Sequence, residues 1–198
     1  VMHACGHDVH SASLLGVIRI LNEIKSELNG KILFVFQPGE EKIPGGAKQM
    51  IEADIFKDNE PDLVIAQHVC PDLLAGEVGF RQGQYMASSD EIYITVKGKG
   101  GHAALPERLV DPVIMAAQLL VSLQQIDSRN NKPGLPTVLS FGNILANGAV
   151  NVIPDEVKLE GTFRTMNEDW RNKAHELIKT IAEQTTAAFG GSAEIEIR

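Results

Sequence analysis

The apolar and polar residues of the first 80 positions follow two alternating patterns. Apolar residues recur every three or four positions over residues 11–28 and again over 45–56, which predicts two amphipathic helices. The continuous apolar runs 31–36 and 63–66 are short and bounded, so they predict buried strands, with a further short strand at 78–80. Apolar strands that alternate with helices predict an α/β layer with a mostly parallel sheet.

The pattern changes near residues 84–90. The elements predicted beyond this point are a half-exposed strand at 91–96, a helix at about 111–126, strands at 137–145 and 156–165, a helix at 168–189 and a strand at 193–197. The order β-α-β-β-α-β is that of a ferredoxin-like split motif. We therefore expect an α/β unit over residues 1–84 and a ferredoxin-like unit over residues 87–198.

The composition is that of a globular protein, since 43% of the 198 residues are hydrophobic and 22% are charged. A net charge of −8 argues against nucleic acid and against an anionic membrane as partners. No apolar run approaches the roughly 18 residues of a membrane-spanning helix. Two cysteines, Cys5 and Cys70, are too few for a disulfide framework, which predicts a reducing compartment and a cytoplasmic location. Cys70 is expected to be a buried thiol.

The chain begins with a dense group of potential metal ligands: His3, Cys5, His7 and His10. Cys5 and His7 are two positions apart, and side chains at this spacing point the same way on an extended segment. A thiolate and an imidazole placed in this way can bind a Zn-like cation or bridge two. His3 and His10 either add to the site or orient it. The alternative is a loop with incidental polar residues and a buried cysteine.

Glu40, Glu41 and His68 follow the two main predicted strands closely. Functional residues of parallel sheets gather at the carboxyl ends of the strands. If one carboxylate binds a cation, its neighbour is free to take a proton from a metal-bound water, whose pKa the metal lowers. The alternatives are a solvated surface pair for the two glutamates and a satisfied structural residue for His68.

Three further candidates lie in the second unit. His102 belongs to the glycine-rich stretch 98–104, which lacks the Gly-Lys-Ser/Thr ending of a phosphate-binding P-loop. Asn151 opens a turn, and Arg164 sits in a predicted strand. Taken singly, each has a structural explanation: an exposed histidine on a flexible turn, a turn residue, and an arginine paired with an acid.

Six segments of the chain carry a family resemblance when they are taken together. They are Met2-His3-Ala4-Cys5-Gly6-His7-Asp8, Gln37-Pro38-Gly39-Glu40-Glu41, Gln67-His68-Val69, residues 98–106 with Asp111-Pro112, residues 151–155, and Gly161-Thr162-Phe163-Arg164-Thr165. In order and spacing they resemble the two-zinc aminoacylase and carboxypeptidase-like amidohydrolases, in the branch that acts on N-acyl amino acids such as hippurate or indoleacetyl amino acids. The resemblance spans nearly the whole chain.

This resemblance implies a role for each residue of the first unit. Cys5 would bridge two metal ions, Zn or Mn, and His7, Glu41 and His68 would be further ligands. Glu40 would be the general base, and later the acid that protonates the leaving amine. Residues 1–84 would thus be part of a catalytic α/β domain whose substrate is a small N-acyl amino acid or peptide.

For the second unit the resemblance implies a lid and dimerisation domain, so that a homodimer would form through residues 87–198. His102 would reach into the partner subunit's site and stabilise the tetrahedral oxyanion. Asn151 and Arg164 would bind substrate, because the arginine fork donates two parallel hydrogen bonds to a carboxylate.

The resemblance further implies that residues 1–198 are an internal piece of such a protein, with catalytic-domain segments on both sides. Glu107 stands where many relatives carry a histidine, which affects the expected substrate preference and not the reaction class. Other readings stay open: a dipeptidase or a deacetylase of the same superfamily, a non-catalytic dimerising lid fragment, or an amidase in which Cys5 is the nucleophile and His7 its base.

Overall fold

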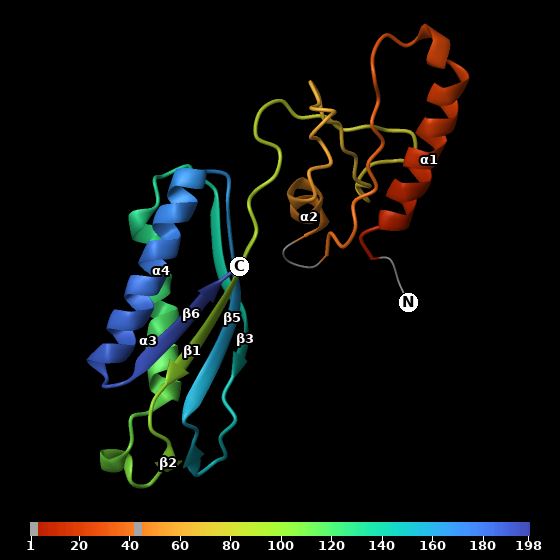
Figure 1. The fold of residues 1–198 in the computed structure, drawn as a ribbon. Helices are drawn as coiled ribbons and strands as arrows, with labels where there is room; N and C mark the ends of the chain where they lie inside the picture. The colour runs from red at the N-terminus through yellow and green to blue at the C-terminus, as the bar shows by residue number, and fades with distance from the viewer. Residues whose placement is uncertain (1–3, 42–44) are drawn as a thin grey trace. The chain divides into compact units, whose positions relative to one another are not determined.

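The structure is a computed structural model that describes residues 4–41 and 45–198, so His3 lies outside the described residues. Helices and sheets combine in a mixed α/β chain, as the sequence predicts. The chain divides into two compact units, Val1–Phe80 and Arg81–Arg198 (Figure 1). None of the described helices is both long and apolar enough to span a membrane.

The described residues of the first unit form one long helix and two short helical elements. Helix α1 spans His7–Glu23, the 3-10 helix η1 spans Lys25–Glu27, and α2 spans Gly46–Glu52. They occupy the two regions where helical periodicity occurs in the sequence. Gly6 precedes α1 with a φ of 69°, in the left-handed region that glycine adopts without steric cost.

The strands expected in the first unit are a wrong prediction for this structure. Residues 31–36, 63–66 and 78–80 form no strand among the described residues. Most of their apolar side chains are open to solvent, with Ile65 85% and Phe80 92% exposed, although Phe34 and Val35 are half-buried. A strand exists only when its backbone N–H and C=O groups pair with a neighbour. Cys70 follows one of these unpaired runs and is exposed, which corrects the expected buried thiol.

The second unit is a four-stranded antiparallel sheet with the strand order β3-β5-β1-β6. Its elements along the chain are β1 (Asp90–Lys97), α3 (Pro112–Leu123), β3 (Thr137–Leu145), β5 (Glu156–Thr165), α4 (Glu168–Ala188) and β6 (Ser192–Ile197). This is the β-α-β-β-α-β arrangement that the sequence predicts. The short elements β2 (Gly101–His102), η2 (Pro106–Arg108), η3 (Ile126–Asn130) and β4 (Val152–Ile153) lie between them.

The core of this unit lies between the sheet and helices α3 and α4, which cover the same face (Figure 1). Alternate residues of β1 face the helices, and Ile92, Ile94 and Val96 are almost completely buried. They pack in one cluster with Leu119 of α3 and Ile178 of α4. The opposite side chains of β1 are polar, because a half-covered antiparallel sheet keeps one face in water.

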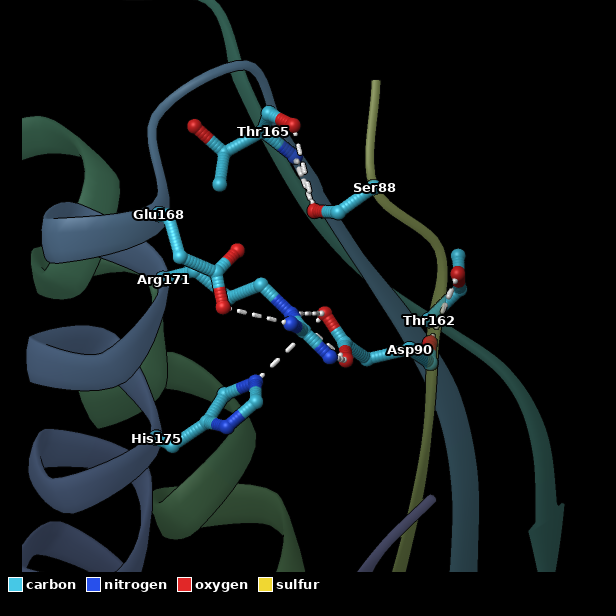
Figure 2. A network of polar contacts seen from close by, with 7 residues as sticks. All are labelled: Ser88, Asp90, Thr162, Thr165, Glu168, Arg171 and His175. Atoms are coloured by element: carbon cyan, nitrogen blue, oxygen red, sulfur yellow. Dashed lines mark hydrogen bonds and ion pairs between the residues drawn. The ribbon is translucent and has the colours of Figure 1, made fainter. Parts of the chain in front are cut away.

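A polar network holds the start of β1 against α4 (Figure 2). Asp90, the first residue of β1, is fully buried and accepts hydrogen bonds from Arg171 of α4. His175, one turn further along α4, has its Nε2 3.4 Å from Asp90 Oδ2. Ser88 lies just before the strand, and its backbone N–H donates to the carbonyl of Thr165 over 2.7 Å.

Candidate functional site

The first turn of α1 places His7 and His10 side by side. The two positions are three apart, so they share one face of the helix, and their ring centroids are 5.3 Å apart. His68, from the loop after residues 63–66, completes a cluster of rings: its centroid is 4.4 Å from that of His10 and 5.9 Å from that of His7. Segments nearly sixty positions apart in the sequence therefore meet here.

The two adjacent glutamates approach the same histidine. His7 Nε2 lies 3.5 Å from Glu40 Oε2 and 3.7 Å from Glu41 Oε1. Both carboxylates are about three-fifths exposed, at 61% and 62% of their side-chain area, so water reaches them. The sequence predicts that one of these two carboxylates binds a cation and that the other remains free to accept a proton.

Two groups of potential ligand atoms lie close enough together to hold a cation. One is Cys5, His7 and Glu41, and the other is His7, His10 and His68; within each group the ligand atoms lie within 4.8 Å of one another. Thiolate, imidazole and carboxylate are the donors of zinc sites, and the thiolate selects soft or borderline cations. His7 belongs to both groups, so the two groups of potential ligand atoms, among the residues that the structure describes, lie side by side.

The electrostatics of the cluster favour neutral Cys5 and His10 side chains. The pKa of the Cys5 thiol is raised, mainly by its hydrogen bond to Glu41, then by the charge of Glu41, by burial and by Glu40. The pKa of His10 is lowered by burial first and then by His68 and His7, against the opposing charges of Asp8 and Glu40. A cation has to displace the Cys5 proton in order to use the thiolate.

His68 has a defined tautomer. Its Nδ1 lies 2.7 Å from the backbone carbonyl oxygen of Val69, and a carbonyl can only accept, so Nδ1 carries the proton. The lone pair of Nε2 is then free. Histidines that bind metals are typically held in this way, with the other ring nitrogen donating to a carbonyl or carboxylate.

In the second unit, His102 and Asn151 are brought together by a small ribbon. Strands β2 and β4 pair His102 with Val152, and the N–H of Ala103 donates to the carbonyl of Asn151 over 3.0 Å. His102 Nδ1 accepts the N–H of Ala104 at 3.1 Å, so in the neutral ring the proton is on Nε2. His102 is exposed, and Nε2–H is a hydrogen-bond donor.

The glycine-rich stretch before His102 is closely packed. A Cβ on Gly98 would lie 2.1 Å from the carbonyl oxygen of Val110, and one on Gly100 would lie 2.3 Å from that of Ile153. The N–H of Gly100 donates to Asp155 Oδ1 over 2.9 Å. The expected alternative of a flexible turn is therefore not what the structure contains, since these glycines permit close backbone contacts.

Arg164 does not join the ribbon. It lies on the exposed face of β5, one residue from the end of the strand, whereas the ribbon precedes Glu156 at the start of that strand. Eight residues at about 3.3 Å per residue separate these two positions by roughly 26 Å. Arg164 and the His102–Asn151 pair thus lie on distinct surfaces of the second unit.

Two contacts of the candidate site have no clear signal in the sequence. The Asp155 carboxylate orders the loop that carries His102, although the sequence indicates only a turn there. The Val69 carbonyl defines the tautomer of His68, although the sequence assigns valine no role. Both act through backbone groups, whose partners depend on the tertiary structure.

Comparison with known proteins gives a consistent set of relatives. The chain is 40% identical over 195 residues to an N-acetylcysteine deacetylase of Bacillus subtilis (strain 168), covering 98% of this chain and 50% of that protein. It is 40% identical over 194 residues to an N-acyl-L-amino acid amidohydrolase of Geobacillus stearothermophilus, covering 98% and 52%. The chain thus spans about half the length of the curated relatives it matches.

A solved structure is similar to this chain over nearly its whole length. The crystal structure of the Bacillus subtilis YXEP protein, a dinuclear metal binding peptidase from the M20 family, matches with a TM-score of 0.75 and 36% identity, over 99% of this chain and 48% of that one. The sequence model of peptidase family M20/M25/M40 matches residues 1–198 in full. The chain therefore belongs to the peptidase family M20/M25/M40.

Proposed function

We propose that the protein containing this chain is a metal-dependent amidohydrolase that cleaves the amide bond of N-acyl amino acids or small peptides. The observation that carries the proposal is the approach of Cys5, His7 and Glu41 to one another, with Glu40 beside the same imidazole. The printed functions of the two bacterial relatives, a deacetylase and an amidohydrolase of N-acyl amino acids, support this substrate class.

The donor set supports two divalent ions as cofactors. Cys5, His7, Glu41 and His68 would hold them, and the Cys5 thiolate favours Zn, with Mn as the alternative. When bound, the ions would supply Lewis acidity that activates water and polarises the acyl carbonyl. Elemental analysis of the purified protein, before and after addition of Zn or Mn, distinguishes the two metals.

Glu40 is proposed to be the general base. Its carboxylate takes a proton from the attacking water as the new C–O bond forms at the acyl carbon, and then delivers a proton to the amine nitrogen as the C–N bond breaks. The products are a carboxylate and a free amine. Its exposure to water, at 61%, supports this role, because a general base must reach both water and the leaving group.

His102 is proposed to stabilise the oxyanion through Nε2–H, which is a donor because Nδ1 accepts the N–H of Ala104. Asn151 and Arg164 are proposed to bind substrate, the arginine through a substrate carboxylate. Because the two lie on distinct surfaces of the second unit, one small substrate would contact both only if Asn151 and Arg164 come from different subunits of the proposed homodimer. Single variants at each residue separate their contributions. Asn151→Ala and Arg164→Ala are both expected to raise KM more than they lower kcat.

Two glutamate variants of the complete protein test the assignment. Glu40→Gln is expected to lower kcat by about 10²-fold or more while two metal ions stay bound, because only the proton transfer is lost. Glu41→Gln is expected to weaken metal binding itself. Glu52→Gln, an exposed carboxylate of α2 paired with Lys48, is the matched control and should change neither property. Full activity in Glu40→Gln would refute the role of Glu40.

The rival activities separate in simple assays. A panel of N-acetyl amino acids, hippurate-like amides and dipeptides distinguishes an acylase, a deacetylase and a dipeptidase. An amidase that uses Cys5 as the nucleophile would retain activity in a chelator and lose it on thiol alkylation, whereas the metal-dependent enzyme is inactivated by the chelator. A cytoplasmic location is proposed with this function, because Cys5 must remain reduced in order to bind metal.

We also propose a homodimer through residues 87–198. The proposal is supported by the exposed apolar side chains of the edge strand β3, Val138, Ile144 and Leu145, since an edge strand with exposed apolar residues is a site for pairing with another chain. Light scattering of the complete protein tests it. A dimer without amidase activity would instead support the reading of the chain as a non-catalytic dimerising module.

A further inference from the structure

Val69 connects two histidines of the candidate metal site through a single residue. Its backbone N–H donates to His10 Nε2 over 3.0 Å, and its carbonyl oxygen accepts from His68 Nδ1 over 2.7 Å. One imidazole therefore binds the backbone N–H of Val69, and the other binds its backbone C=O. Their rings are the closest pair of the cluster, with centroids 4.4 Å apart.

The two hydrogen bonds require the same tautomer, with the proton on Nδ1, but they use different nitrogens of the two rings. A backbone N–H can only donate, so His10 Nε2 must be the unprotonated nitrogen, and the proton of the neutral ring is on Nδ1. Neither nitrogen of His10 then has a lone pair available for a cation. His68 is the same tautomer, but its hydrogen bond uses Nδ1–H as the donor, so the lone pair on Nε2 stays free. His10 lies near the potential ligands, but its hydrogen bond to the Val69 N–H uses the lone pair with which it would bind a cation.

The side chain of Val69 makes a third contact with the same segment. A Cβ on Gly6 would lie 2.8 Å from Val69 Cγ2, which places Gly6 against the valine. Gly6 is the residue between Cys5 and His7, and its φ of 69° favours glycine. Val69 thus contacts the segment of Cys5 and His7 through its side chain, and the first turn of α1 through its backbone.

We propose that His10 is a positioning residue of the metal site: acting through the peptide N–H of Val69, it holds His68 beside His7 with Nε2 free for a cation. This inference rests on the proposed function, because it assigns His68 as a ligand. Of the group His7, His10 and His68, only His7 and His68 are accordingly ligands. His10 holds His68 in place without contacting the cation.

The test compares three variants of the complete protein in metal titrations, with zinc affinity measured by competition against a chromophoric chelator. His10→Gln places an amide oxygen near the position of Nε2, keeps the acceptor for the Val69 N–H, and is expected to bind zinc within a few-fold of the wild type. His10→Phe keeps the ring shape without the acceptor, and is expected to weaken zinc binding by about 10- to 100-fold. Ser11→Ala, an exposed neighbour on α1, is the control.

The absorption spectrum of the cobalt-loaded protein reports which ligands bind the ion, which an activity assay does not. If His10 positions His68, His10→Gln keeps the wild-type spectrum; if His10 is itself a ligand, both variants alter the spectrum and lose affinity equally, which overturns the inference. Unchanged zinc affinity in a His10→Phe variant with wild-type circular dichroism also overturns it. A wild-type protein that binds no metal would overturn the proposed function, and this inference with it.

Discussion

The guanidinium of Arg171 donates its Nε–H to both carboxylate oxygens of Asp90, each over 2.9 Å (Figure 2). Asp90 is fully buried, whereas the Arg171 side chain is 29% exposed and also donates to Glu168 over 2.9 Å. The pKa of Arg171 is raised chiefly by its hydrogen bond to Asp90. The buried carboxylate at the first position of β1 is therefore paired with a cation that α4 supplies.

Replacing Arg171 with Met is expected to destabilise the second unit by about 3 kcal/mol, because it leaves Asp90 buried without its cation. The measurement is hydrogen exchange of the amides of β1 and α4 in the complete protein. Lys179→Met is the matched control on the same helix, since its exposed pair with Glu176 contributes only about 0–1 kcal/mol. Equal protection in the two variants would contradict the importance of the buried pair.

Gly100→Ala is expected to disrupt the loop that carries His102, because the new Cβ would lie 2.3 Å from the carbonyl oxygen of Ile153. Overpacking of this kind costs about 1–3 kcal/mol. Gly142→Ala is the control, since nothing lies within 4 Å of a Cβ at that position. The expected result in thermal unfolding of the complete protein is a lower midpoint for Gly100→Ala alone, together with a lower kcat if His102 acts in catalysis.

The two exposed thiols, Cys5 and Cys70, are expected to react differently with an alkylating reagent. In metal-free protein, Glu41→Gln should speed the alkylation of Cys5, because the hydrogen bond and charge of Glu41 raise the thiol pKa and only the thiolate reacts. Added zinc should then protect Cys5 in the wild type. Cys70 is the internal control, and peptide mass spectrometry reports both sites. Equal protection of both thiols by zinc would argue against a specific site at Cys5.

The pKa of Tyr93 is raised above its usual value, first by the hydrogen bond to Glu91 over 2.8 Å and then by burial and by the charge of Glu91. A raised pKa means that the protonated phenol contributes stability below pH about 10 and that this contribution is lost as the pH rises further. Glu91→Gln is expected to lower the pKa of Tyr93 towards its usual value.

Absorbance of the tyrosinate during alkaline titration measures this shift. Tyr93→Phe assigns the signal, because the difference between its titration and that of the unsubstituted protein comes from Tyr93. An unchanged Tyr93 titration in Glu91→Gln would show that Glu91 is not the cause of the raised pKa.

The sequence by itself determined the secondary structure of the second unit. The predicted strands 137–145 and 156–165 coincide with β3 and β5, and the strand predicted at 91–96 lies within β1. Alternating polar and apolar positions identify a half-buried strand directly, because one face of the sheet is covered by helices and the other is open to water. The helices α3 and α4 follow from apolar spacing, and the structure adds a side-chain cap at the start of each, Asp111 and Asn167.

Apolar content alone did not determine the strands expected in the first unit. Residues 31–36 and 63–66 have the composition of buried strands, yet they remain unpaired in the part of the chain that the structure describes. A helix satisfies its backbone hydrogen bonds within itself, whereas a strand needs a neighbour, and the presence of that neighbour cannot be read from the strand's own residues.

For the candidate site, residue types and a short spacing identified Cys5 and His7, because neighbouring positions stay close in any fold. The family resemblance of residues 37–41 identified the two glutamates, since the strand expected before them is absent from the described residues. Only the tertiary structure decided that His68 lies against His10. It also decided the two hydrogen bonds of the Val69 backbone, which occupy Nε2 of His10 and leave Nε2 of His68 free. It alone decided the pairing of Asp90 with Arg171, 81 positions away. A hydrogen bond between distant segments depends on how the chain packs, which no local pattern encodes.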